Sequence, residues 1–587
     1  MDGRGIEKNQ SSSKKLVLSL VTISFLASCA NATLNSEIKT YDEANKNLKA
    51  RSASVYSSQS SSNTTINESL NSTHTISGSN NTLIVESSGT IQVSGNNNKA
   101  VDFTQGSSTS TFKNEGTLIG GSNTASVNLG TNNQNGATIE TFTNEGIIGN
   151  GSSKFAITVW GKSDNKSTIN NFSNSGTIHS NAGESIYLGN TDIQTFSNSG
   201  TIKSNSGQGV NIASGTTIDN FNNSGVIEGK INKGVLHITS GVIKTLTNTG
   251  TIKNTGNAEP YGYHLVSMGT YLYTSTVETF TNSGLISGVI GLGLVASTIN
   301  NLTNTGTIES TSSNKIAAAI NVNTLYSNVS VIDNLTNEGL IKSNSHGILA
   351  ESGNEIKTLT NKGTIEASLN GITFNDFGGL SGNTMKLGKI ILENGSIIKA
   401  GNNGINIDNG SSKGVEADGI EVKSGAVVEG GNSGIYIGGG KEIDTQITIS
   451  GSVTGGTAGI VNEGVIGGSS SSEDGSTGGI IISGGSVSSS SGGSGIVNQG
   501  NGSITGEIKV ESGGSVEGGI TNTGSGSISG SIVVESGGKL DSITNTSSSS
   551  TGISGSITNN SDNDLSISNS GNIGGKIEST GSADMVI

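Results

Sequence analysis

The sequence predicts an all-β protein that folds as a right-handed parallel β-helix, a solenoid of three-sided coils. One short phrase recurs along the chain at intervals of 22 to 34 residues, which is typical of solenoids. The chain is rich in residues that favour turns and short strands, with 90 Gly, and it has one Pro among 587 residues. Because each inner strand of a β-helix is hydrogen-bonded on both sides, Pro is excluded almost everywhere.

The recurring phrase is Phe-Ser-Asn-Ser-Gly-Thr-Ile, as in Phe172–Ile178. An apolar residue lies four positions before the Gly, an Asn two before it, and an Ile or Leu two after it. The ten glycines are Gly116, Gly146, Gly176, Gly200, Gly225, Gly250, Gly284, Gly306, Gly339 and Gly363. We expect three short strands per period, stacked so that like residues lie over like, with inward Asn amides bonding from coil to coil. Gly would serve a corner that needs positive φ, and the crossover rule favours a right-handed coil.

Residues 1–32 are predicted to be an export signal, because Lys14-Lys15 precede an apolar run, 16–27, too short to span a membrane. Two cleavage sites remain open. Leu26–Cys29 is similar to a bacterial lipobox, which would make Cys29 the site of lipid attachment. Ala30–Ala32 has the small-x-small form that directs cleavage before Thr33. Cys29 is the single Cys of the chain, which favours the lipobox and leaves the exported protein without a disulfide.

The rest of the chain divides into three predicted parts. Residues 33–64 lack the repeat and are expected to be a tether or cap. Residues 65–375 hold the coils of the recurring phrase, with longer excursions at 130–136, 254–276 and 310–330. Residues 376–587 hold thinner, Gly/Ser-rich coils with aliphatic rungs, in phrases such as Ile508–Gly513 and Gly495–Gly500, and end without a predicted cap.

The charge and the C-terminal composition restrict the function. The formal charge is −14 and the two Arg lie at Arg4 and Arg51, which argues against a nucleic-acid partner. No aromatic residue follows Tyr436, so the last 150 residues do not match the aromatic girdles of a transmembrane β-barrel. We therefore expect an exported solenoid that is truncated before any such barrel.

A signal segment, a tether and a long solenoid of Phe/Leu-x-Asn-x-Gly-Thr-Ile phrases together resemble the passenger region of type V autotransporters. The resemblance is closest to the Campylobacter-type adhesion autotransporters, some of which carry a lipobox like Leu26–Cys29. It covers nearly the whole chain. It implies display outside the outer membrane, contact with host cells and a C-terminal barrel, which is the one part that this sequence does not match.

One set of residues is a candidate for enzymatic chemistry. These are the polar residues two positions before each Phe or Leu of the phrase, which would stack into one row, the polar rank. Its members are Glu140, Asn170, Gln194, Asp219, Lys244, Glu278, Asn300, Asp333 and Lys357. Neighbouring carboxylates could form an acid and base pair of the glycosidase type. The rank alternates carboxylates with neutral or opposite groups, however, which favours a stacked edge that avoids repulsion.

Other motifs are weak. The five His residues, His74, His179, His237, His264 and His346, form no close pair, so no zinc site is predicted. The stretch 473–476 only superficially matches a serine nucleophile loop, and Gly438–Lys441 lacks the strand-loop-helix setting of a phosphate cradle. Tyr261, Tyr263, Tyr271 and Tyr273 cluster in one excursion and either project as a contact surface or pack on the flank. We predict no catalytic, metal or cofactor-binding residues.

Two hypotheses of different class follow. The first is a non-enzymatic surface adhesin or structural rod that contacts host cells or neighbouring bacterial cells through many weak contacts. It would lie at the cell surface or outer membrane if a barrel is supplied, and otherwise in the periplasm or on a lipid anchor. The second is a secreted β-helix polysaccharide lyase or hydrolase, and a truncated, undisplayed fragment is a further alternative. A cleft lined by acids and aromatic residues would favour the enzyme.

Overall fold

The computed structural model describes residues 62–132, 134–260, 266–323, 328–351, 353–375, 385–408, 415–467 and 478–587. The coils lie within residues 63–77 and 81–587, which form one compact unit. Leu26–Cys29, Tyr261, Tyr263, His264 and the stretch 473–476 lie outside the described residues, as does nearly all of the predicted signal and tether.

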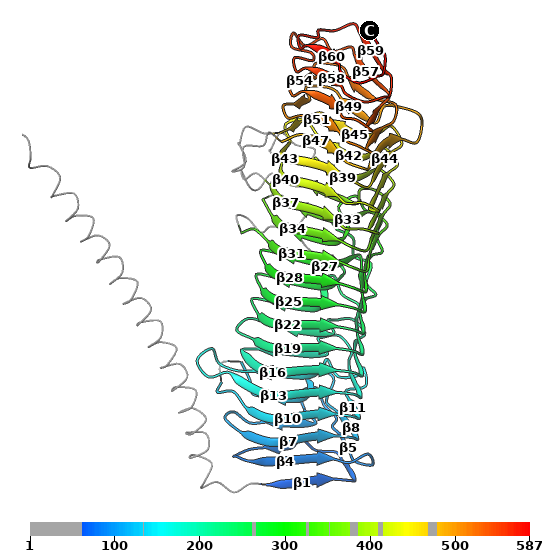
Figure 1. Ribbon diagram of the computed structural model, residues 1–587. Helices are drawn as coiled ribbons and strands as arrows, with labels where there is room; N and C mark the ends of the chain where they lie inside the picture. Colours follow the sequence, from blue (N-terminus) through cyan, green and yellow to red (C-terminus); the bar gives the residue numbers. More distant parts are fainter. Residues whose placement is uncertain are drawn as a thin grey trace, which may run out of the picture. The chain divides into compact units, whose positions relative to one another are not determined.

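The described residues form a right-handed parallel β-helix, as predicted (Figure 1). Its strands make three parallel sheets of 23, 18 and 20 strands, and no helix occurs among these residues. The first sheet runs from β1 (Asn63–Ile66) to β60 (Ile577–Ser579), the second from β2 (Ser69–Leu70) to β56 (Lys539–Leu540), and the third from β3 (His74–Ile76) to β61 (Met585–Val586).

One coil shows how the phrase folds. β16 (Thr191–Asn198) lies in the first sheet, β17 (Thr201–Ser204) in the second and β18 (Val210–Ile212) in the third. In β16 the apolar and Asn positions of the phrase point inward and are buried. The Gly forms the corner between the first and second sheets, and the Ile after it is buried on β17.

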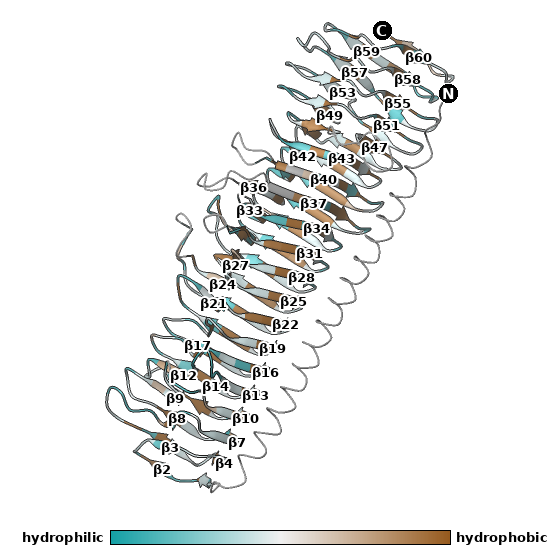
Figure 2. Ribbon diagram, turned by 90° about the vertical axis from the view of Figure 1, so that its left-hand side faces the viewer, coloured by the Kyte–Doolittle hydropathy of each residue, from teal (hydrophilic) through white to brown (hydrophobic). Residues whose placement is uncertain are grey.

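Like residues stack on like in the core. Phe112, Phe142, Phe172, Phe196 and Phe221 lie in register on successive strands of the first sheet, with ring centroids 4.5–4.8 Å apart. On later coils Leu occupies the same position, apart from Phe280, and Ile occupies it from Ile390 onward. Figure 2 shows hydrophobic segments recurring on the strands from coil to coil. A single coil could not bury such side chains, so stability comes from stacking.

A row of buried Asn residues accompanies the apolar rungs. Ten of them lie in register, and in each of nine successive pairs Nδ2 donates to Oδ1 of the next coil at 2.7–2.8 Å. The row comprises Asn114, Asn144, Asn174, Asn198, Asn223, Asn248, Asn282, Asn304, Asn337 and Asn361. Val85 lies in register before its first member and Leu392 after its last. A second row, on the third sheet, runs from Asn462 to Asn569.

The reason given above for the corner glycines is wrong for the first half of the solenoid. None of the ten phrase glycines has positive φ. A Cβ added to any of them would instead lie 2.0–2.2 Å from the carbonyl oxygen of the corner Gly one coil earlier. Close approach of stacked backbones therefore requires Gly there. In the later coils several Ser-Gly or Asn-Gly turns do use positive φ, as at Gly395 (+80°) and Gly425 (+79°).

Two features of the later and longer coils differ from expectation. From β43 (Glu442–Ile449) onward the first sheet divides, because both β46 (Val465–Ile466) and β47 (Ile480–Ile482) pair with β43. On the next coils the chain makes a further corner at glycines such as Gly530. The excursions 254–276 and 310–330 are not wholly loops, since β24 (Met268–Tyr273) and β30 (Ala318–Asn323) within them are strands of the third sheet.

Candidate functional site

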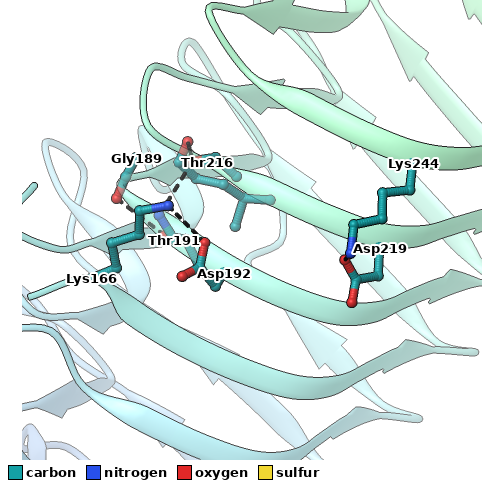
Figure 3. Close-up of polar contacts among 8 residues, drawn as sticks. Lys166, Gly189, Thr191, Asp192, Thr216, Asp219 and Lys244 are labelled. Atoms are coloured by element: carbon teal, nitrogen blue, oxygen red, sulfur yellow. Dashed lines mark hydrogen bonds and ion pairs between the residues drawn. The ribbon is translucent and has the colours of Figure 1, made fainter. Parts of the chain in front are cut away.

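The predicted polar rank lies on the outer face of the first sheet, where its members are exposed or half-exposed, and contacts between coils join several of them. Lys244 Nζ lies 2.6 Å from Asp219 Oδ1, and Lys357 Nζ lies 2.7 Å from Asp333 Oδ1. Asn170 donates to the Glu140 carboxylate. Figure 3 shows the Asp219 pair beside the similar pair of Lys166 and Asp192, on neighbouring coils.

No two carboxylates of this rank stand on successive coils. The rank also has no buried member, so each ion pair contributes about 0–1 kcal/mol. This arrangement matches the interpretation of a stacked edge that avoids repulsion.

The histidines among the described residues are dispersed, and two of them are buried. His237 stacks on Tyr271 with ring centroids 5.0 Å apart, and burial lowers its pKa to about 3. His346 Nε2 donates to the carbonyl of Lys315 at 2.9 Å, and burial lowers its pKa to about 4. Both are therefore neutral at ordinary pH. In the described ranges, no three His, Cys, Asp or Glu residues are grouped so that they could hold a metal ion.

This contact decides between the two predicted arrangements for part of the Tyr cluster. Tyr271 and Tyr273 belong to β24, where Tyr271 packs on His237 of the strand before it, and burial raises the pKa of the Tyr271 phenol. These two rings therefore pack on the flank of the solenoid. Gly438–Lys441 forms a turn between β42 (Ser433–Ile437) and β43, with no helix after it.

The outer face of the third sheet carries a groove of about 580 Å³. Its floor is one outward residue from each of five successive strands: β36 (Ile372–Asn375), β39 (Asn403–Ile407), β42, β45 (Ala458–Asn462) and β49 (Ile496–Asn498). These floor residues are Thr373, Asn406, Tyr436, Val461 and Val497, which lie in register. The floor is therefore a row that runs along the solenoid axis.

The two walls come from the segments on either side of these strands. Before the strands lie Asn370, Asn402, Asn432 and Thr457. Asn402 Nδ2 donates to Asn370 Oδ1 at 3.0 Å, and Thr457 Oγ1 donates to Asn432 Oδ1 at 2.9 Å. After the strands lie Asp408, Glu463 and Gln499. One wall is therefore a row of amides and a hydroxyl, and the other is acidic.

Glu463 and Tyr436 hold each other in place. Tyr436 donates its hydroxyl to Glu463 Oε2 at 3.0 Å, and Gln499 Nε2 donates to Glu463 Oε1 at 2.7 Å. Burial, followed by this hydrogen bond, raises the pKa of the Tyr436 phenol, so it stays protonated. No Lys or Arg is among the described residues that line the groove.

Two buried polar atoms of the groove lack a partner among the described residues. They are Oδ1 of Asn403 and Oγ of Ser433, whose residues are 4% and 0% exposed. A buried polar atom without a hydrogen bond costs about 1–3 kcal/mol. Asn403 and Ser433 are register partners on β39 and β42, so the two unsatisfied atoms belong to neighbouring coils.

The groove was not predicted from the sequence. Its floor has a signal in the phrases Gly404-Ile-Asn-Ile407 and Gly434-Ile-Tyr-Ile437, in which one variable residue stands between two buried aliphatic ones. Reading that variable position along the stack would have found the floor.

Cys29, the predicted lipid attachment site, lies outside the described residues. Within the part of the chain that the structure describes, no helix has the length and apolar character needed to cross a membrane. Comparison with models of known protein families, with curated proteins and with solved structures finds no match to this chain.

Proposed function

We propose that this protein is an exported, non-enzymatic surface adhesin or structural rod that acts in bacterial attachment or aggregation. The observation that carries the proposal is the in-register repetition of outward polar residues. On the first sheet, Thr247, Thr281, Thr303, Thr336 and Thr360 lie one per coil at matching positions. Repeated weak contacts of this kind add to strong binding through multivalency.

The location that we propose rests on the N-terminal sequence. The apolar run 16–27 after Lys14-Lys15 supports export, and Cys29 supports a lipid anchor at the outer membrane. An autotransporter passenger would reach the surface with a barrel supplied in the full reading frame. The partners would then be host-cell surfaces or neighbouring bacterial cells.

A coil deletion tests the proposal. Removing residues 199–248 joins Asn198 to Thr249, which recreates the recurring phrase, keeps the Asn row and shortens the solenoid by two coils. Attachment of cells that display this variant is expected to fall in proportion to the coils removed. As a control, removing residues 305–337 takes out one coil and joins Asn304 to Glu338. If either deletion abolishes attachment and the other has no effect, a single local site is responsible and the multivalent rod is refuted.

The groove favours a second candidate, a carbohydrate-active β-helix enzyme. Asp408 and Glu463 follow strands two coils apart, with Gly438 at the same position between them. Two strand spacings correspond to about 9.6 Å, near the carboxylate separation of inverting glycosidases, about 6.5–9.5 Å. The test is release of reducing ends from neutral polysaccharides by the purified protein. Activity that Glu463→Gln removes would support this candidate, and no release from any substrate would exclude it.

A further inference from the structure

We propose that the groove on the outer face of the third sheet binds an extended, neutral oligosaccharide laid along the solenoid axis. The inference goes beyond the proposed function, because it assigns one local site and one ligand class in addition to the repeated weak contacts of the rod.

The shape of the groove fits a chain-like ligand. Its floor crosses five strands, so it extends over four strand spacings, or about 19 Å. The floor residues are aligned along the axis, and the two walls follow the same direction on either side. A ligand that is long and narrow can therefore contact several coils at once.

The unpartnered atoms call for a ligand rich in hydroxyl groups. Asn403 Oδ1 is an acceptor that needs a donor, and Ser433 Oγ can both donate and accept. The Nδ2 of Asn403 is already engaged with Asn406 Oδ1 at 2.7 Å, which fixes the orientation of the amide. Sugar hydroxyls both donate and accept, so they match the chemistry of both atoms.

Tyr436 supplies an apolar surface at the centre of the floor. Its ring is half-buried and its hydroxyl is held by Glu463. An aromatic side chain with an apolar body and a bound polar tip suits a ligand that has apolar C–H faces and polar edges. Because the ring is already fixed, little side-chain freedom is lost on binding.

The charges of the groove select against anionic ligands. Glu463 contributes a carboxylate to one wall of the groove, and no Lys or Arg occurs among the described lining residues. An acidic polysaccharide would meet this like charge. The groove therefore favours a neutral glycan over an acidic one, a nucleic acid or a phosphorylated ligand.

The experiment is calorimetric titration of the full exported chain with cellohexaose, maltohexaose, chitohexaose and hexagalacturonate. At least one of the three neutral hexasaccharides is expected to bind, and hexagalacturonate is expected to bind at least tenfold more weakly. Tyr436→Ala should weaken binding at least tenfold. Its matched control is Tyr187→Ala, because Tyr187 is an outward residue in the same register row of the third sheet but lies outside the groove.

A second pair of variants separates binding from folding. Ser433 and Ser396 are both fully buried with an unpartnered Oγ, and only Ser433 lines the groove. Ser433→Ala and Ser396→Ala should each leave the Tm unchanged or higher, because each removes an unsatisfied atom. Ser433→Ala alone should weaken oligosaccharide binding, by at least threefold. A destabilised structure would not produce this combination.

Several results would overturn the inference. These are no binding of any neutral hexasaccharide, tighter binding of hexagalacturonate, or wild-type affinity in Tyr436→Ala. The titration uses purified protein without cells, so it is independent of the attachment assay. A chain that supports attachment but binds no oligosaccharide refutes only the groove. A chain that binds oligosaccharide while coil deletions leave attachment unchanged refutes only the rod.

Discussion

The Asn row makes a prediction that depends on position within the row. Asn223 accepts from Asn198 Nδ2 at 2.7 Å and donates to Asn248 Oδ1 at 2.7 Å. In Asn223→Leu, the buried Oδ1 of Asn248 loses its donor, and the hydrogen bond from Asn198 is also lost. An orphaned buried acceptor costs about 1–3 kcal/mol and a lost hydrogen bond about 1 kcal/mol, so we expect a loss of about 2–4 kcal/mol.

Asn361 provides the matched comparison, because it ends the row. It accepts from Asn337 at 2.8 Å, and the residue in register after it is Leu392. In Asn361→Leu, no Asn further along the row is deprived of a donor. Leu392 shows that an aliphatic side chain fits this position. Both variants also lose two longer hydrogen bonds from Nδ2 to backbone carbonyls, at 3.1–3.4 Å. Asn361→Leu should therefore cost about 1–3 kcal/mol less than Asn223→Leu, which is the cost of the orphaned Oδ1 of Asn248.

The measurement is amide hydrogen exchange in the coils that flank each substitution, together with the Tm from calorimetry. Local exchange is needed because repeat arrays do not always unfold in one step. We expect faster exchange around residue 223 in its variant than around residue 361 in the other. Equal effects in the two variants would refute the argument that orphaned acceptors, rather than lost bonds alone, set the cost.

Three further predictions concern the corners, the core and pH. Gly225→Ala places a Cβ 2.1 Å from a backbone oxygen and should prevent local stacking of the coils. Gly395 has positive φ and open space around it, so Gly395→Ala should lower stability by only about 1–2 kcal/mol, the cost of a left-handed conformation for Ala. Equal losses of Tm in the two variants would contradict this. Phe196→Ala should cost about 3–5 kcal/mol in thermal unfolding and Phe196→Leu clearly less, since Leu occupies this register position on other coils; similar losses would argue against the stacked core. His346 has a pKa of about 4 in the folded protein and an ordinary value of 6.5, so the free energy of unfolding should fall by about 3 kcal/mol as pH drops from 6.5 to 4. Burial raises the pKa of Glu351 from 4.5 to about 7, so the free energy of unfolding should fall as pH rises from 4.5 to 7. His346→Gln and Glu351→Gln should remove these slopes, with opposite signs, in Tm measured against pH; slopes of the same sign would contradict the assignment.

Much of the first two sheets was predictable from sequence, because one phrase encodes both. The Phe or Leu and the Asn define a strand of the first sheet, and the Ile after the Gly defines the second. The stacking and the amide row follow from repetition alone. The role of the corner Gly could not be predicted in the same way. A sequence shows that Gly stands at this position, but not whether a positive φ or the close approach of another backbone excludes a side chain.

The third sheet was harder to predict, and the groove depends on it. Strands such as β24 and β30 vary in sequence and lie among longer insertions, so they read as loops. Their outward residues are set by local surroundings rather than by the need to stack in the core. The groove also joins floor and wall residues from distant segments, such as Asn370 and Gln499, which are 129 positions apart and which only the coil register brings together.

The direction of the Asn row has an electrostatic consequence. All nine side-chain hydrogen bonds have their donor on the coil nearer the N-terminus, so the amide dipoles point the same way. Asn114, at the beginning, accordingly has an Oδ1 without a partner among the described residues. The uncharged interior thus carries a polarity like that of an α-helix, with partial negative charge at Asn114 and partial positive charge at Asn361. Because the row is buried, dissolved salt should screen this axial field far less than it screens the ion pairs outside.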